Sequence, residues 1–365
     1  MPLFSYNNIK ISGIASAVPT KLVKSTDYSE KFGEETVSKF IEMTGIKEHR
    51  QTLEHQTASD LGFVAADFLL KEKKIDRESI GALIFGAHST DFRRPATACV
   101  LHKRLGLTKN CAAFDVNLGC SAFVYAATIA SSLLATSDIQ KVLVIVGETM
   151  TKMTSPDDRS SIMLFGDGGS AILLEKAEEN SSIKSILKSD GNGWKSIICP
   201  SGGFRNMVAP TEFMMFPDGY NRSMYKTYMN GTDVFSFTIS DVPKTIKEFF
   251  EKTETSVDDY DCFAMHQANQ FIHKQLAKKI KIPMEKMPLS LDRFGNTSAP
   301  AIPLTLCDKY GNDTDSKELN TLMCGFGVGL SWGVVSAKIN TADIYPIIET
   351  DDYFKEGIIN SPEDL

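Results

Sequence analysis

The amino-acid sequence predicts an α/β fold with parallel β-sheet, organised as two similar halves. Two observations lead to this prediction. Short apolar runs alternate with longer segments of helical character, which is the spacing of strands joined by helical crossovers. The order of these segments in the second half of the chain follows their order in the first half, which indicates an internal duplication.

Each predicted element of the first half rests on its own pattern. The strands are short apolar runs, and the helices are longer and mostly amphipathic. In chain order, we expect a helix at 61–74, a strand at 81–89, a helix at 97–107, a strand at 112–118, a helix at 120–137 and a strand at 141–148. The helix at 120–137 is almost wholly apolar, so we expect it to be buried between layers.

The second half echoes the first in three places. Each pair shares the same order of elements: 241–269 matches 63–89, 286–310 matches 112–134, and 329–339 matches 167–176. We therefore predict an N-terminal half at 1–177 and a C-terminal half at 178–340, divided in a polar stretch. Two segments lie outside the duplication: an insertion at 200–228, rich in Met, aromatic residues, Pro and Gly, and an acidic extension at 341–365.

Composition excludes several classes of protein. The chain has 365 residues and a formal net charge of −7, whereas a nucleic-acid-binding protein usually carries a basic face. No apolar run approaches the length of a membrane span, and the N-terminus lacks the pattern of a signal peptide. The seven cysteines are scattered without a CxxC pair, so we expect no disulfide framework or metal site, and a reducing, cytoplasmic location.

Cys120 is the strongest candidate for a nucleophile. It follows a predicted strand and Asn117–Gly119, and it opens the long apolar helix. A thiol at a helix N-terminus meets unpaired backbone N–H groups and the positive end of the helix dipole, and both favour the thiolate. A lone cysteine is more often a small buried packing residue, which is the competing interpretation.

His266 and Asn296 are the candidates in the second half. His266 ends an apolar strand, and catalytic groups in parallel α/β sheets gather at the carboxyl ends of strands; a structural hydrogen bond there is the alternative. Asn296 lies in a loop between strand and helix, where a turn or capping role is the alternative. His273 is expected to be solvated, and the other histidines, including His88, have no setting that suggests a role.

The segment Gly325–Gly333 is dense in glycine and leads into a predicted strand. Closely spaced glycines allow backbone N–H groups to approach a ligand. A phosphate-binding loop does not fit, because the glycine spacing matches neither phosphate-binding fingerprint and a strand rather than a helix follows.

Together the motifs stand in a characteristic order along the chain: DVNLGCSA, FGDGGSA, HQAN, GNTSAPAIP and GFGVGLSWG. In this order, from about residue 8 to 340, the chain resembles the ketoacyl synthase III group of the thiolase superfamily, which starts fatty-acid and polyketide chains. The resemblance implies a five-layered αβαβα fold made of two duplicated halves. It also implies a catalytic triad of Cys120, His266 and Asn296, with an oxyanion hole formed by the backbone N–H groups of Cys120 and Gly329.

The implied activity is that of a 3-oxoacyl-thioester synthase, an acyltransferase. Cys120 accepts an acyl primer from a thioester, and a malonyl thioester, most simply malonyl-acyl carrier protein, loses CO2 and attacks that primer. Asn296 cannot act as a base, which favours decarboxylation over proton abstraction. The substrates are CoA or carrier-bound thioesters, and no further cofactor is implied. Cys-dependent acyl transfer to an alcohol or amine, and a non-catalytic scaffold with a vestigial site, are the alternatives.

The resemblance also assigns residues that bind the CoA or pantetheine arm, namely Arg159, Gly231, Phe235 and Asn269. Relatives that use acyl-CoA clamp its adenine between this Arg and a Trp, and Lys39 stands where the Trp is expected. We therefore predict that the primer arrives on acyl carrier protein, unless another aromatic residue such as Phe40 replaces the Trp.

Docking of an acidic carrier protein requires local positive charge. The predicted helix after His266 carries Lys274, Lys278 and Lys279, and the first two share a face because they are four residues apart. We expect carrier protein to dock on this helix. A solvated helix face is the alternative.

The loop around Arg94 matches the family segment that crosses a homodimer interface and closes the partner's acyl pocket. A large apolar residue is usual there, so Arg94 either recognises a polar acyl group or points outward or pairs structurally.

We expect the insertion at 200–228 near the pocket entrance, as cavity wall, lid or packing element, and the acidic extension as a solvated terminus. These departures favour a specialised lipid or polyketide pathway over bulk fatty-acid initiation.

Overall fold

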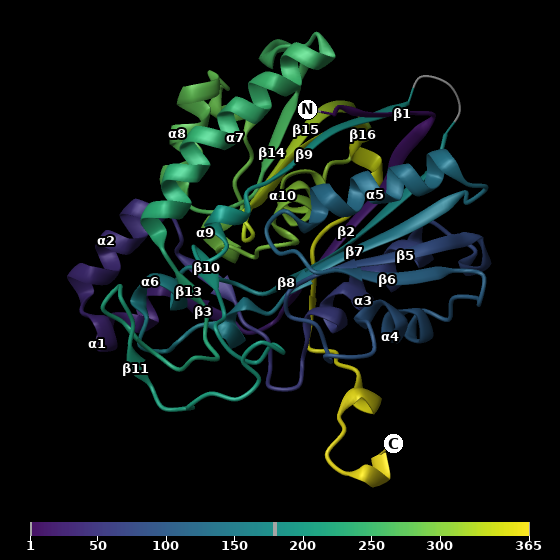
Figure 1. Ribbon diagram of the computed structural model, residues 1–365. Helices are drawn as coiled ribbons and strands as arrows, with labels where there is room; N and C mark the ends of the chain where they lie inside the picture. Colours follow the sequence, from purple (N-terminus) through teal and green to yellow (C-terminus); the bar gives the residue numbers. More distant parts are fainter. Residues whose placement is uncertain (1, 178–180, 365) are drawn as a thin grey trace.

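The computed structural model describes residues 2–177 and 181–364. Two β-sheets lie face to face with helices between them and on both outer faces, so the layers run helix, sheet, helix, sheet, helix (Figure 1). The expected five-layered αβαβα fold is confirmed. The predicted boundary at 177/178 falls beside residues 178–180, which lie outside the described residues.

The first sheet draws most of its strands from the N-terminal half. Its order is β17 (Ile348–Thr350), β2 (Ile9–Pro19), β8 (Gly168–Lys176), β7 (Lys141–Glu148), β5 (Ile80–Gly86) and β6 (Ala112–Val116). β17 belongs to the C-terminal extension and pairs with β2, so the extension covers one edge of this sheet. The opposite edge is β6, which has no strand on its outer side within the described ranges.

The second sheet draws its strands mainly from the C-terminal half. Its order is β1 (Phe4–Asn7), β9 (Ser182–Ser189), β16 (Ser331–Asn340), β15 (Glu318–Gly327) and β14 (Cys262–Met265). The first strand of the chain therefore pairs with β9 and lies in the sheet of the other half.

Both sheets are mixed, which corrects the prediction of a parallel sheet. β5 pairs in parallel with β6 and β7, and helical crossovers connect these strands along the chain. β15 and β16 are joined by residues 328–330 alone, and a connection this short forces an antiparallel pair. The alternation of strand and helix patterns thus predicted the parallel strands that helices connect, but not the antiparallel strands that short turns connect.

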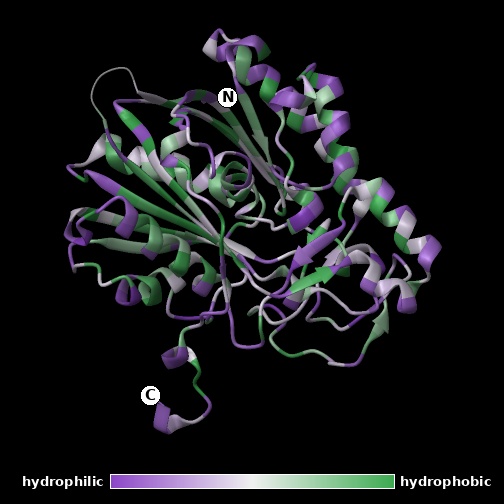
Figure 2. Ribbon diagram, turned by 180° about the vertical axis from the view of Figure 1, so that it is seen from behind, coloured by the Kyte–Doolittle hydropathy of each residue, from purple (hydrophilic) through white to green (hydrophobic). Residues whose placement is uncertain are grey.

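The helices form three layers. α5 (Ala122–Thr136) and α10 (Ala301–Tyr310) lie between the sheets, α3 (Ala58–Glu72) and α4 (Thr97–Arg104) cover the first sheet, and α7 (Gly231–Thr253) and α8 (Gln270–Ile280) cover the second. In Figure 2, hydrophilic and hydrophobic residues alternate along α7 and α8, as expected of helices with one face in solvent. Among the described helices, none combines the length and apolar character that crossing a bilayer requires.

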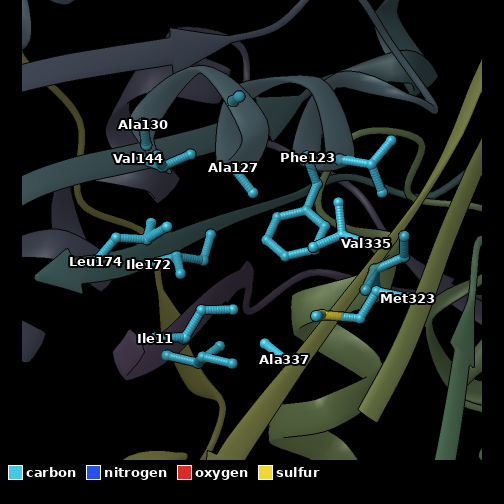
Figure 3. Packing of buried hydrophobic residues seen from close by; sticks show 14 of the residues in the cluster. Ile11, Phe123, Ala127, Ala130, Val144, Ile172, Leu174, Met323, Val335 and Ala337 are labelled. Atoms are coloured by element: carbon cyan, nitrogen blue, oxygen red, sulfur yellow. The ribbon is translucent and has the colours of Figure 1, made fainter. Parts of the chain in front are cut away.

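The central helix α5 is buried, as its composition predicted. Phe123 and Ala127 on this helix belong to one core cluster with Ile172 of the first sheet and Met323 and Val335 of the second (Figure 3). A helix that contacts a sheet on both sides needs apolar residues all round. This packing fixes the N-terminal end of α5, where Cys120 lies, relative to both sheets.

Shorter elements surround one end of this framework. They are α1 (Ser29–Phe32), α2 (Glu34–Thr44), α6 (Arg159–Ile162), α9 (Leu291–Phe294), β3 (Leu22–Lys24), β4 (Glu48–Arg50), β10 (Ile197–Ile198), β11 (Met214–Met215), β12 (Asn221–Arg222) and β13 (Tyr228–Met229). The insertion at 200–228 contributes β11 and β12, which form a small hairpin, and Tyr220 between these strands accepts a hydrogen bond from Arg159 of α6.

A buried ion cluster holds the insertion in place. Arg222 is 1% exposed, and its guanidinium donates to Asp158 at 2.6 Å and to Asp218 at 2.7 Å. The rings of Phe216 and Tyr228 lie against the same guanidinium. Because a buried cation is tolerated only when it is paired, these contacts fix the second part of the insertion against the start of α6.

The C-terminal extension is only partly solvated. The backbone N–H of Phe354 donates to a carboxylate oxygen of Asp60 at 2.9 Å, and its ring lies 4.7 Å from the guanidinium carbon of Arg104. Beyond this contact the chain projects from the body of the molecule (Figure 1). The expectation of a solvated terminus was therefore wrong for the first part of the extension, which completes the first sheet.

Candidate active site

Cys120, His266 and Asn296 all line a cavity of about 580 Å³. Cys120 follows β6, His266 directly follows β14, and Asn296 lies in the loop between α9 and α10. β6 and β14 are strands of different sheets, so each half of the chain contributes to the cavity wall. The structure thus brings together the three residues that the sequence proposed as a triad.

Cys120 sits in a tightly packed, buried position. Its sulfur lies 3.5 Å from the hydroxyl of Ser298. A Cβ atom added at Gly327 would lie 2.9 Å from this sulfur, so only glycine permits the approach of β15 to the nucleophile. Burial raises the pKa of the Cys120 thiol to about 11, against smaller opposing effects of Ser298 and nearby backbone N–H groups. At neutral pH the thiol is therefore protonated, whereas the sequence suggested a thiolate.

His266 is a neutral base. Burial, together with the neighbouring His273, lowers its pKa to about 3. Its ring meets the ring of Phe326 edge-on, with centroids 5.2 Å apart. Its Nδ1 atom is buried without a hydrogen-bond partner in the part of the chain that the structure describes. A neutral imidazole with a vacant position can accept a proton from a thiol or serve a substrate.

His273 does not lie in solvent, as the sequence suggested, but is fully buried on α8. Its Nε2 atom is 3.0 Å from the backbone carbonyl oxygen of His266. Burial lowers the pKa of His273 to about 4, so the ring stays neutral and one nitrogen can donate to that carbonyl. His273 therefore positions the strand end that carries His266.

Asn296 has its side chain oriented by its own loop. Its carbonyl oxygen accepts a hydrogen bond from the backbone N–H of Ser298 at 2.9 Å. The amide NH2 group then has no partner among the described residues and is free to donate into the cavity. Gly295 permits the turn, because its φ of 64° and the nearby carbonyl of Leu164 leave no room for a Cβ atom.

The surroundings of the sulfur favour Val328 over the predicted Gly329 as the second candidate oxyanion donor. The backbone N–H groups of Cys120 and Val328 both lower the pKa of the thiol, which places them beside the sulfur. Val328 lines the cavity, whereas Gly329 is absent from its described lining. Gly329 instead occupies the turn into β16 with a φ of 140°, which suits glycine alone. The candidate donor pair is therefore Cys120 and Val328.

The predicted residues for the pantetheine arm divide into two groups. Gly231, Phe235 and Asn269 line the cavity, and Asn269 also caps α8. Arg159 does not belong to the described lining; its Nε atom donates to the hydroxyl of Tyr220 in the insertion at 3.0 Å. Lys39, which replaces the expected Trp, is exposed and pairs with Glu35. Neither Arg159 nor an aromatic residue at position 39 is therefore available at the cavity to clamp an adenine ring.

Three exposed lysines mark α8. Lys274 and Lys278 line a shallow depression of about 450 Å³ together with Lys281, and Lys279 is exposed beside them. The floor of this depression is apolar and includes Ile282.

The loop of Arg94 lies at the surface of the single chain. Arg94 is exposed, and its neighbour Arg93 places its guanidinium carbon 5.8 Å from the ring centre of Phe204 in the insertion. The insertion itself contributes Ser201, Gly203 and Thr227 to the cavity wall, in line with the expected position near the entrance.

Among the cavity residues that the sequence did not identify as site residues, two carry polar side chains at strand ends. His88 follows β5 and Asn117 follows β6, and both line the cavity beside Cys120. Their position at the carboxyl ends of adjacent parallel strands was the available signal.

Comparisons with known proteins agree with this arrangement. Residues 114–191 match the family described as 3-oxoacyl-[acyl-carrier-protein] synthase III, and residues 250–339 match the C-terminal part of the same family. A β-ketoacyl-[acyl-carrier-protein] synthase III of Clostridium acetobutylicum is 33% identical over 91% of this chain and 99% of its own length.

Solved structures give the same result. A 3-oxoacyl-(acyl-carrier protein) synthase of Burkholderia xenovorans aligns with a TM-score of 0.89 and 34% identity, over 96% of this chain and 99% of that one. A β-ketoacyl-[acyl carrier protein] synthase III of Thermus thermophilus aligns with a TM-score of 0.80 and 30% identity, over 90% of this chain and 99% of that one. The chain therefore belongs to the β-ketoacyl-[acyl-carrier-protein] synthase III family of acyltransferases, which have the thiolase fold.

Proposed function

We propose that this 3-oxoacyl-thioester synthase joins a primer held on Cys120 to a malonyl group carried by acyl carrier protein. The observation that supports this most strongly is the meeting of Cys120, His266 and Asn296 in one cavity. The chemistry needs no metal or redox cofactor, and we place the protein in the cytoplasm, because its seven scattered cysteines suit a reducing compartment.

In the first step, the sulfur of Cys120 attacks the carbonyl carbon of an acyl thioester while His266 takes the thiol proton. The buried ring of His266 is neutral and so has a lone pair to accept the proton, which moves as the thioester carbonyl takes up the electrons of the sulfur. The negative charge on the carbonyl oxygen is received by the N–H groups of Cys120 and Val328; one such donor is typically worth about 100- to 1000-fold in rate. The bond to the donor sulfur then breaks, and the departing thiolate takes the proton back from His266.

In the second step, the malonyl thioester loses its carboxylate as CO2, and the electron pair of the broken bond forms an enolate. The free NH2 group of Asn296 and an N–H of His266 donate to the enolate oxygen. The enolate carbon attacks the acyl carbonyl, the bond to Cys120 breaks, and the thiolate regains a proton from solvent. The product is a 3-oxoacyl thioester on the carrier protein.

The primer donor is acyl carrier protein rather than CoA. Lys39 offers no aromatic surface for adenine, and Arg159 is engaged by Tyr220. The exposed Lys274 and Lys278 on α8 provide a positive surface close to Asn269, which lines the cavity. This charge suits an acidic carrier that inserts its pantetheine arm beside Phe235.

We further propose that the protein is a homodimer joined along β6. This edge strand has no outer neighbour within the described chain, and its Phe114 and Val116 are only partly buried. Asp115 of the same strand accepts hydrogen bonds from the backbone of Thr97 and Ala98 at the start of α4. The loop of Arg94 is thereby held next to the exposed edge.

Intact-protein mass spectrometry tests the proposed reaction. The protein is mixed with acyl-carrier and acyl-CoA forms of several primers, and then with malonyl-carrier protein while CO2 is collected. We expect a mass gain that disappears in Cys120→Ser, followed by CO2 release and loss of the added mass. Acylation without CO2 release, but with transfer to an alcohol or amine, would support the simple acyltransferase instead. Absence of acylation by any donor would remove the proposal.

A further inference from the structure

Three adjacent parallel strands of the first sheet end beside the nucleophile. Asn117 follows β6, His88 lies shortly after β5, and Glu148 ends β7. Polar side chains at the carboxyl ends of neighbouring strands converge on one place. None of these three residues has a part in the proposed condensation.

Glu148 holds His88 in a fixed position. The Glu148 carboxylate is fully buried and accepts hydrogen bonds from the backbone N–H of His88 at 2.9 Å and from that of Ser89 at 3.1 Å. The hydroxyl of Ser89 donates to the same carboxylate at 2.6 Å. With its oxygens bound to this turn, the carboxylate orients His88 rather than binding a ligand itself.

The imidazole of His88 lies next to the nucleophile. A Cβ atom added at Gly119 would be 3.0 Å from Nδ1 of His88 and 3.1 Å from the hydroxyl oxygen of Ser298. That hydroxyl is itself 3.5 Å from the sulfur of Cys120. His88 and Ser298 therefore flank Gly119, the residue directly before the nucleophile.

His88 and Asn117 present unused hydrogen-bonding groups to the cavity. Within the described residues, no partner is found for either ring nitrogen of His88 or for the side-chain amide of Asn117. Much of the remaining wall is apolar and includes Met150, Leu164 and Ile198. His88 is half-buried and Asn117 is exposed, so their free groups are accessible to a ligand that enters the cavity and can hydrogen-bond to it.

We propose that His88 and Asn117 form a polar subsite that selects a primer with a hydroxyl group close to its thioester carbonyl. An imidazole and an amide each offer both a donor and an acceptor, and a hydroxyl group can use both. A carboxylate on the primer fits less well, because the fully buried Glu148 lies behind His88 and repels a second negative charge. This inference rests on the proposed function, since it describes the group that Cys120 accepts.

The test compares three primers of equal chain length on acyl carrier protein: butyryl, 3-hydroxybutyryl and succinyl. The rate of Cys120 acylation is measured by intact-protein mass spectrometry in a single turnover. For the wild-type protein we expect 3-hydroxybutyryl to react about tenfold faster than butyryl, because a hydrogen bond gained by its hydroxyl group is worth up to roughly that factor. We expect succinyl to be the slowest.

Variants assign the preference to the subsite. His88→Phe should lose the preference for the hydroxyl group while still accepting butyryl, and His88→Gln should restore part of it. His55→Phe, a change of an exposed histidine, should behave as wild type. These outcomes separate recognition of the hydroxyl group from a general loss of structure, which would slow all three primers alike.

Several results would overturn the subsite. Equal wild-type rates for butyryl and 3-hydroxybutyryl would do so without any variant, and faster reaction of succinyl would show that the cavity recognises an anion instead. Equal slowing of every primer in both His88→Phe and His88→Gln would make His88 a packing residue. Acylation by butyryl alone would refute the subsite and leave the proposed function intact, whereas failure of every primer with wild-type protein would remove both.

Discussion

The nucleophile and its base form a neutral pair because both are buried. Cys120 lies at a helix N-terminus, which favours thiolate, yet burial dominates and raises the thiol pKa to about 11. Burial acts in the opposite direction on the imidazole of His266 and lowers its pKa to about 3. At neutral pH the thiol keeps its proton and the imidazole can accept it, so activation coincides with attack on a substrate.

This neutral pair predicts the pH dependence of alkylation. Because thiolate is the reactive form and the thiol pKa of Cys120 is about 11, iodoacetamide labelling should accelerate by about tenfold per pH unit from pH 7 to pH 9. Peptide mapping by mass spectrometry distinguishes Cys120 from exposed Cys99, which serves as the internal control. A rate at Cys120 that levels off below pH 8 would mean that the helix N-terminus outweighs burial.

The sequence identified the candidate catalytic residues more readily than the burial and hydrogen-bond partners of the residues around them. Cys120, His266 and Asn296 could be selected because each stands at a strand or helix end within a motif. His273 was misplaced, since an amphipathic pattern locates a helix face only approximately and the buried bond to the His266 carbonyl is not visible in sequence. The oxyanion donor was assigned to Gly329 rather than Val328 because, in a run of glycines, sequence does not fix which N–H points at the sulfur.

Among the elements, α8 joins the site to the surface. Its N-terminal cap, Asn269, lines the cavity, and its exposed lysines lie further along the same helix. The helix periodicity predicted this element well, although the sequence did not indicate the depression that Lys274 and Lys278 share with Ile282. Such a depression depends on how the end of the helix packs against the following loop.

Charge reversal on α8 tests carrier docking. In Lys274→Glu/Lys278→Glu, we expect carrier-dependent turnover at low salt to fall by about tenfold or more, because steering of an acidic partner depends on local charge. Added salt should slow the wild type and narrow the gap between the two proteins. Lys74→Glu, just after α3 on the opposite outer layer, reverses one exposed charge away from α8 and serves as a control. Unchanged kinetics in the α8 variant would move the docking surface elsewhere.

For the whole molecule, the fold was predictable from motif order, but the assignment of strands to sheets was not. The short strand β1 joins the second sheet and β17 joins the first, so both ends of the chain pair with the other half. These strands are too short and too irregular in pattern to be placed by periodicity. Their positions follow from tertiary pairing with β9 and β2.

The open edge at β6 predicts the assembly state. Sedimentation equilibrium should give about twice the chain mass of 40.2 kDa, in keeping with the preference of homo-oligomers for twofold symmetry. Ala112→Lys places a charge on the exposed start of this strand and should weaken the dimer by about tenfold in Kd, since edge lysines oppose strand pairing. Ala135→Lys, at an exposed alanine near the end of α5, should leave the mass unchanged. A monomeric wild-type protein would contradict the proposed dimer.

The extension strand β17 has a consequence for growth beyond the dimer. A sheet with two uncovered edges can add copies at both, and such addition has no natural stopping point. In the described chain β17 pairs with β2 and becomes the edge strand itself, and its 3 residues offer a second copy far less backbone than the 11 residues of β2 would. Contact between two β6 strands would consume the open edge of each copy. The C-terminal extension, which the sequence predicted to be a solvated terminus, would then limit the growth of this sheet beyond the dimer.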